Sequence, residues 1–293
     1  MLTLPFALSF ALPVAGFLLA APEAIAGAPA AVAVAVAEPV RARLVSERTA
    51  LVPGQPAALG IEFSIDPAWH LFWDGCNNTG YPITIHPKMP DGVRAREVEW
   101  PAPARLVSPG DILDHVYERR VLLILPIDVA ADLAPGTDVV LACRLDWVAC
   151  HDACVVGGAD VSIRVPVASG RETASLSKDA PEFERARARL PRAAAQAAPW
   201  LRARWTDETL VIEADGAESL AFFPSEGCVS LVDPLADCES SANRLEIRYR
   251  RVDGRLGPAS GVLDLKRSGE SAHRFISLEV SVPDGTSHSS HSH

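Results

Sequence analysis

The sequence predicts an all-β protein, an antiparallel sandwich followed by a second, smaller β domain, with a short helical linker between them. Apolar and polar residues alternate with period two in many short runs, as in ALGIEFSID at residues 58–66. Clusters of Pro and Gly such as PGQP, MPDG and SPGD separate these runs at the spacing of turns. Short alternating runs punctuated in this way are typical of sandwiches.

Length and charge limit the class of protein. The chain has 293 residues, which is enough for one large domain or two ordinary ones. Its net charge is -10, and no long run of like charges concentrates it. Nucleic acids and anionic membrane surfaces attract basic patches, so we expect neither as the main partner.

The first residues differ in character from the rest. Residues 4–21 are apolar, and the small residues Ala24 and Ala26 suit cleavage by a signal peptidase. We therefore expect residues 1–26 to be a signal peptide and the protein to be exported to a compartment where disulfides form. An uncleaved membrane anchor is the alternative, since no Lys or Arg precedes the apolar run.

Composition divides the remaining chain. Residues 38–168 are predicted to form the sandwich, and residues 200–282 the second β domain. Residues 169–199 between them are rich in Ala, Arg and Glu and predict a partly helical linker, with a helix from Pro181 to about Ala198 that could break at Pro191. Residues 283–293 form a low-complexity tail of His and Ser, for which we expect disorder.

Six cysteines in an exported chain suggest disulfides and allow 15 connectivities. Cys228 and Cys238 are the two in the second domain, on either side of a predicted turn, and a structural disulfide between them is the default expectation. Cys76 and Cys143 form a second possible pair. Cys143 and Cys150 lie in one extended run, about 23 Å apart at 3.3 Å per residue, which excludes a bond between them if the strand is continuous.

The stretch LDWVACHDACVV, residues 145–156, holds the remaining cysteine pair. In an extended strand Cys150 and Cys154 would be about 13 Å apart, too far to bond. The flanks on both sides are strand-like, so a three-residue hairpin loop is predicted to bring the two sulfurs within bonding distance. A disulfide at an exposed tip is easily attacked, which favours exchange chemistry over a structural role.

Several motifs resemble one family in order along the chain. They are PAWHLFWDGCNNTGYPITI at 67–85, VEWPAPARL at 98–106, HVYERRVLLILPI at 115–127 and the cysteine stretch itself. Together they resemble the N-terminal periplasmic domain of the thiol:disulfide interchange protein DsbD, in the ScsB-like branch. The likeness covers residues 38–282 and is strongest over residues 58–168.

The resemblance implies an immunoglobulin-like sandwich whose redox dithiol, Cys150 and Cys154 here, relays electrons. The expected partners are a membrane electron donor of the DsbD/CcdA type and periplasmic thioredoxin-like proteins. The family's membrane and thioredoxin-like domains have no counterpart in this sequence, so the donor would be a separate protein. The chain would then be a protein-disulfide reductase component, and no cofactor is expected.

Neighbouring residues are candidates for supporting the dithiol. A protonated His151 would lower a thiol pKa and Asp152 would raise it, so local charge does not select the attacking sulfur. By analogy with the family, Cys154 is expected to face the partner. Trp147 and Tyr117, with Trp69, Phe72 and Trp73, are candidates for covering the site, and packing in the sandwich core is their alternative role.

Two other function classes stay open at this point. Soft thiolates select Cu(I), so the same cysteines, with His288, His291 and His293 of the tail, could bind or deliver copper. A redox-inert binding module with a structural disulfide is the third possibility. Apart from this copper alternative, the sequence predicts no metal site.

Overall fold

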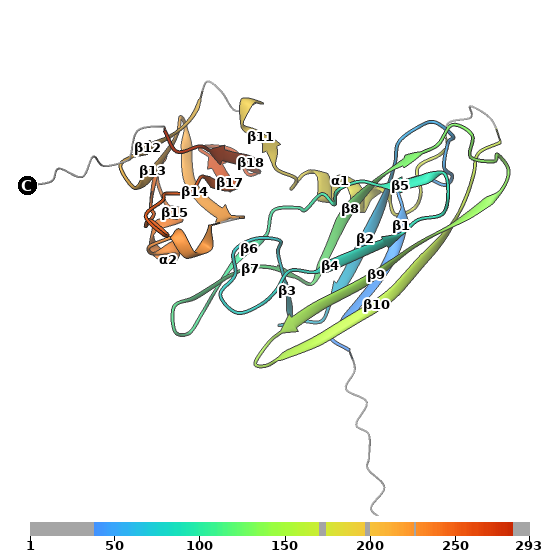
Figure 1. Cartoon of the computed structure of the whole chain (residues 1–293), viewed down its shortest axis with the longest axis horizontal. Helices are drawn as coiled ribbons and strands as arrows, with labels where there is room; N and C mark the ends of the chain where they lie inside the picture. The colour runs from blue at the N-terminus through green and yellow to red at the C-terminus, as the bar shows by residue number, and fades with distance from the viewer. Residues whose placement is uncertain (1–37, 170–173, 197–199, 226, 284–293) are drawn as a thin grey trace, which may run out of the picture. The chain divides into compact units, whose positions relative to one another are not determined.

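The computed structural model describes residues 38–169, 174–196, 200–225 and 227–283 (Figure 1). Two pairs of β-sheets account for most of these residues, and the predicted all-β class with a short helical linker is confirmed. The predicted signal peptide and all but the first residue of the predicted tail lie outside the described residues. No helix in the described part of the chain combines the length and apolar character needed to cross a membrane.

The first sandwich consists of two antiparallel sheets, with strand orders β1-β2-β8-β5 and β10-β9-β3-β7-β6, and β4 pairs with β9 as well. Its strands are β1 (Val40–Ser46), β2 (Ala57–Ile65), β3 (His70–Phe72), β4 (Thr84–Lys88), β5 (Val93–Ala95), β6 (Ala104–Ser108), β7 (Ile112–Glu118), β8 (Arg120–Val129), β9 (Asp138–Cys150) and β10 (Cys154–Pro166).

Period two decides which side chains fill this sandwich. Leu59, Ile61, Phe63 and Ile65 of β2, which the sequence places on one face, are all at most 5% exposed. They share a core with the odd-numbered residues of β9 from Leu141 to Ala149. The even-numbered residues of β9 therefore lie on the outer face of the second sheet, where the functional site is built.

The second unit has a five-stranded sheet of order β11-β18-β17-β14-β15 and a three-stranded sheet of order β12-β13-β16. A separate core that includes Leu210, Ile212 and Leu263 lies within it. Its elements are β11 (Arg192–Ala193), η1 (Ala194–Gln196), β12 (Leu201–Thr206), β13 (Thr209–Ala214), β14 (Ala217–Pro224), η2 (Cys228–Ser230), α2 (Pro234–Asp237), β15 (Glu239–Ser240), β16 (Arg244–Arg248), β17 (Ala259–Arg267) and β18 (His273–Val280).

The linker helix is shorter than the sequence predicts. Helix α1 spans Ala180–Arg187, and the chain beyond Pro191 enters β11 rather than continuing as a helix. The residue before a proline is disfavoured in the helical region, which explains why the helix stops before Pro191. Asp179 stands at the N-cap position of α1, but its side chain makes no capping hydrogen bond.

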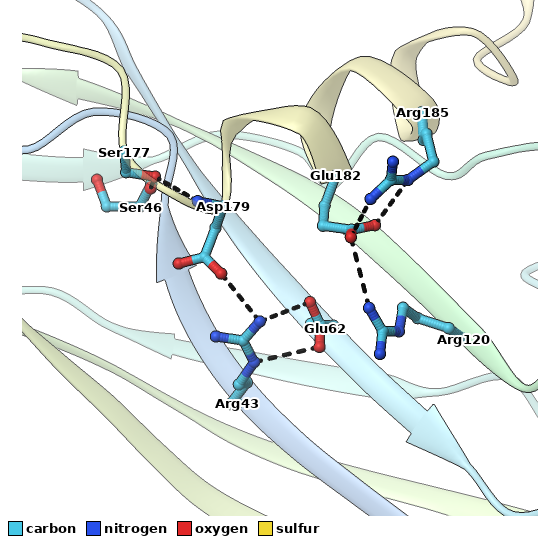
Figure 2. A network of polar contacts seen from close by, with 8 residues as sticks. All are labelled: Arg43, Ser46, Glu62, Arg120, Ser177, Asp179, Glu182 and Arg185. Atoms are coloured by element: carbon cyan, nitrogen blue, oxygen red, sulfur yellow. Dashed lines mark hydrogen bonds and ion pairs between the residues drawn. The ribbon is translucent and has the colours of Figure 1, made fainter.

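The carboxylate of Asp179 instead belongs to a network that holds α1 on the sandwich (Figure 2). Arg43 of β1 donates to Glu62 of β2 at 3.1 and 2.9 Å, and to Asp179 at 3.0 Å. Glu182 accepts from Arg120 and Arg185. Beneath this network the fully buried Phe183 packs on Val45, Leu122 and Ile124. The linker thus covers the outer face of the sheet that does not carry the cysteine hairpin.

Candidate functional site

Strands β9 and β10 form one long hairpin whose tip carries the cysteine pair. They are paired without interruption from Cys150 opposite Cys154 to Asp138 opposite Pro166. Residues 151–153 make the three-residue loop that the sequence predicts. Cys150 and Cys154 are joined by a disulfide, with their Cα atoms 4.1 Å apart. The distance argument from the sequence is therefore confirmed.

The two sulfurs of this disulfide differ in access. Cys154 is exposed, whereas Cys150 is only 3% exposed. The loop residues His151 and Asp152 are exposed too, and the His151 Nδ1 lies 3.2 Å from an Asp152 carboxylate oxygen. A reagent approaching the hairpin tip therefore meets Cys154 first, with Cys150 behind it.

Cys150 is covered by residues of the neighbouring strands. It packs in a small cluster with Phe72 of β3 and Val116 of β7. The Phe72 ring lies so close to Gly80 that a Cβ there would be 2.1 Å from ring atoms, so only glycine allows the loop to close over this ring. The sequence included Phe72 among the candidates for covering the site, and this contact supports that expectation.

His70 is a neighbour of Cys150 that the sequence analysis did not include among the candidate site residues. It is buried, and it stands directly opposite Cys150 in the β3–β9 ladder. Burial lowers the pKa of His70, and the nearby carboxylates of Asp114 and Glu118 oppose that shift. A neutral imidazole therefore lies beside the buried sulfur. Pairing between β3 and β9 has no local sequence signal, which is why this neighbour was missed.

Trp147 and Tyr117 do not cover the disulfide. Both lie in the sandwich core, at 5% and 6% exposure, and the Tyr117 hydroxyl donates to the Pro101 carbonyl oxygen at 2.5 Å. Trp147 is an odd number of residues from Cys150 in one strand, so its side chain points to the opposite face of the sheet. The expectation that these two residues support the site is corrected to the core role.

The other cysteine pairings predicted from the sequence are wrong. Cys76 is bonded to Cys228, 152 residues away, while Cys143 and Cys238 are buried free thiols. Helix α2 turns the chain between Cys228 and Cys238, so Cys228 is exposed and Cys238 enters the second core. Cys143 is on the core face of β9 and packs in the first core. Burial raises the pKa of Cys143 to about 11 and that of Cys238 to about 12, so neither provides a ready thiolate.

The Cys76–Cys228 bond fastens the loop after β3 to the second unit. Asp114, at 2% exposure, accepts from the backbone N–H groups of Asn78 and Thr79 and from the Thr79 hydroxyl. The Cys76 N–H donates to the Pro224 carbonyl oxygen at 2.9 Å. The same loop abuts, at Gly80, the Phe72 ring that covers Cys150, so the disulfide and Asp114 both hold the segment next to this ring.

Copper ligation is the alternative role that the sequence allows for the same cysteines. Within the residues that the structure describes, no three or more His, Cys, Asp or Glu side chains are grouped to hold a metal ion. The tail residues His288, His291 and His293 lie outside that part of the chain.

Comparison with known proteins identifies the fold and the domain. The family model for the N-terminal domain of the thiol:disulfide interchange protein DsbD matches residues 41–165. The N-terminal periplasmic domain of ScsB from Proteus mirabilis superposes with a TM-score of 0.55 at 12% identity, covering 84% of this chain and 95% of that one. The reduced DsbD N-terminal domain from Neisseria meningitidis gives a TM-score of 0.27 at 11% identity, covering 43% and 83%. No curated protein sequence matches.

The ScsB likeness extends over both β units, and at its low identity it establishes the fold. The family match runs from the second residue of β1 to the penultimate residue of β10 and includes the cysteine hairpin. The chain therefore carries a DsbD N-terminal-like domain of immunoglobulin-like fold, to which the Cys150–Cys154 hairpin belongs.

Proposed function

We propose that this protein is a thiol–disulfide exchange protein and that the Cys150–Cys154 pair is its working dithiol. The observation that carries the proposal is the asymmetric disulfide at the hairpin tip. One sulfur is exposed to a partner, and the other is buried at bonding distance behind it. An exchanging pair needs one accessible sulfur to attack and one adjacent sulfur to resolve the mixed disulfide.

The reaction transfers two electrons in two displacement steps. The Cys154 thiolate attacks a partner disulfide, forming a Cys154–partner bond and releasing the partner's other cysteine as a thiolate. The Cys150 thiolate then attacks the Cys154 sulfur and releases the partner's first cysteine. The partner is left as a dithiol, and the Cys150–Cys154 disulfide is restored. A dithiol donor that runs the same steps in reverse reduces the protein again.

Family resemblance supports the assignment of partners. A separate membrane protein of the DsbD/CcdA type would supply the electrons, and periplasmic thioredoxin-like proteins would receive them. The chain would work in the periplasm, reached through the signal peptide expected at residues 1–26. Its acidic surface, with a net charge of -10, agrees with protein partners rather than nucleic acid.

Electron transfer to an oxidised thioredoxin-like protein tests this function. The pre-reduced protein is mixed with an equal amount of an oxidised periplasmic thioredoxin-like protein, and the thiols of each are counted by alkylation and mass spectrometry. We expect two thiols to appear on the acceptor for each Cys150–Cys154 bond that forms. The matched control is the Cys150→Ser/Cys154→Ser variant, which keeps Cys76 and Cys228. If the acceptor gains thiols equally from this variant, the dithiol is not the donor.

A further inference from the structure

Strand β10 leaves one backbone edge unpaired directly beside Cys154. It is the terminal strand of its sheet and pairs with β9 alone (Figure 1). Close to its far end, Leu51 forms a bridge with Val167 and donates to the Pro166 carbonyl oxygen. Among the described residues, the backbone from Cys154 to Val165 makes no hydrogen bond beyond the β9 ladder.

The pairing geometry shows which backbone groups face this edge. Antiparallel residues directly opposite each other are about 5.5 Å apart at Cα in a hydrogen-bonded pair and about 4.5 Å apart in a non-hydrogen-bonded pair. The 4.1 Å between Cys150 and Cys154 belongs to the second kind. The N–H and C=O of Cys154 therefore point away from β9, and by the period of two so do those of Val156 and Gly158.

The residues of this stretch carry none of the usual edge protections in their own sequence, although β1 of the facing sheet approaches β10. Proteins usually guard a free edge with charged side chains, proline or a bulge. Residues 154–159, CVVGGA, contain no charge and no proline, and their register with β9 is unbroken. Val156, on the same face as Cys154, is 87% exposed. Charge begins at Asp160, which pairs with Lys88 and Arg144.

We propose that the redox partner docks by adding a strand: an extended segment carrying its disulfide cysteine pairs with β10 from Cys154 to Gly158. The proposal rests on the exchange function given above and specifies how its substrate is held. Main-chain hydrogen bonds to the outward groups of Cys154, Val156 and Gly158 would supply affinity, as in other strand-addition complexes. The substrate class is a disulfide in an extended polypeptide segment.

Strand addition also places the sulfurs for reaction. A partner cysteine opposite Cys154 in a hydrogen-bonded pair has its Cα about 5.5 Å away, within the range of about 4.4–6.8 Å that a disulfide spans. Cys150, Cys154 and the partner cysteine then form a row across three neighbouring strands, with their side chains on one face. Displacement at a disulfide sulfur requires the attacking and leaving sulfurs on opposite sides of it, which is this arrangement.

Strand addition is tested by comparing how fast Cys154 reacts with two probes, one small and one an extended peptide, that release the same leaving group. The parent protein is Cys150→Ser, in which Cys154 cannot re-form its own disulfide. The small probe is 5,5′-dithiobis(2-nitrobenzoate), and the extended probe is the peptide Val-Thr-Cys-Thr-Val with its cysteine activated by the same nitrothiobenzoate. The rate of nitrothiobenzoate release is measured with each probe, and the rate with the peptide is divided by the rate with the small probe. Val156→Pro removes one outward N–H, and prolines are tolerated on strand edges that face solvent.

We expect Val156→Pro to lower this ratio at least about fivefold, the effect of losing one net hydrogen bond. Ser162→Pro, on the same exposed edge beyond the proposed segment, is the matched control and should leave the ratio unchanged. A peptide N-methylated at its cysteine should lose the same factor against the parent protein, a readout that needs no folding of a second variant.

Three results would overturn the inference. The ratio could be the same for parent and Val156→Pro, Ser162→Pro could lower it equally, or N-methylation could leave the peptide rate unchanged. If a second copy or another segment of this chain occupied the β10 edge, the peptide could not pair with it and N-methylation would leave the peptide rate unchanged. Failure of the proposed function itself is read in the electron-transfer experiment, where the acceptor would gain no thiols from the Cys150–Cys154 pair.

Discussion

Removal of the Cys76–Cys228 disulfide is expected to lower the free energy of unfolding by about 5 kcal/mol, the largest stability effect in this chain. The bond links residues 152 apart, and the chain-entropy cost of closing a loop of that length in the unfolded state grows with its logarithm. The Cys150–Cys154 bond closes a far shorter loop, and the same relation gives about 2 kcal/mol.

Denaturant unfolding of Cys76→Ala/Cys228→Ala measures this effect, with Cys150→Ser/Cys154→Ser as the matched control. The first double variant should lose more stability than the second, by about 3 kcal/mol on the chain-entropy relation. Equal losses of unfolding free energy in the two double variants would show that the Cys76–Cys228 bond does not add the stability that its long loop predicts. The Cys76 side chain is buried, so a small additional loss from the missing sulfur is expected in the first variant.

Single serine variants of the hairpin cysteines are expected to give opposite outcomes in exchange. Cys154→Ser should form no mixed disulfide with an oxidised thioredoxin-like protein, because the remaining sulfur, Cys150, is 3% exposed and lies under Phe72. Cys150→Ser should form the mixed disulfide and accumulate it, because no second thiol resolves it. Non-reducing electrophoresis with mass spectrometry of the linked peptides identifies the cysteine in each adduct.

Trapping of the partner by Cys150 would contradict this assignment of the two cysteines. If Cys154→Ser traps the partner through Cys150, the buried sulfur is the attacking one, and the order of the two steps is reversed. The partner would then have to displace Phe72 and the loop at Gly80 that abuts it. A Cys154→Ser variant that also carries Cys76→Ala/Cys228→Ala separates such an opening from direct access, since it releases that loop from the second unit.

Local pattern predicted the fold class and the hairpin, because both depend on residues close together in the chain. The four-residue step between Cys150 and Cys154 and the strand-like flanks were sufficient to place a turn at residues 151–153. The same period of two would have placed Trp147 on the face opposite Cys150. That information was present in the sequence, and the expectation for Trp147 did not use it.

Long-range pairing was beyond local pattern. The Cys76–Cys228 bond joins a loop after β3 to the turn after β14, and nearness in sequence favoured Cys238 instead. His70 opposite Cys150 likewise depends on which strands become neighbours. Register within a hairpin follows from its turn, whereas contacts between separate hairpins follow from packing of the whole sandwich.

Stepwise reduction with disulfide mapping tests the central claim, that Cys150–Cys154 is the working pair and Cys76–Cys228 is structural. Both bonds pair an exposed with a buried cysteine, but Cys154 stands at the tip of a three-residue hairpin loop, whereas Cys76 lies in a loop that Asp114 also holds. The native protein is exposed to increasing dithiothreitol, alkylated and mapped by mass spectrometry. We expect Cys150–Cys154 to open first, with Cys76–Cys228 still intact. Opening of Cys76–Cys228 first, or of both bonds together, would contradict this expectation.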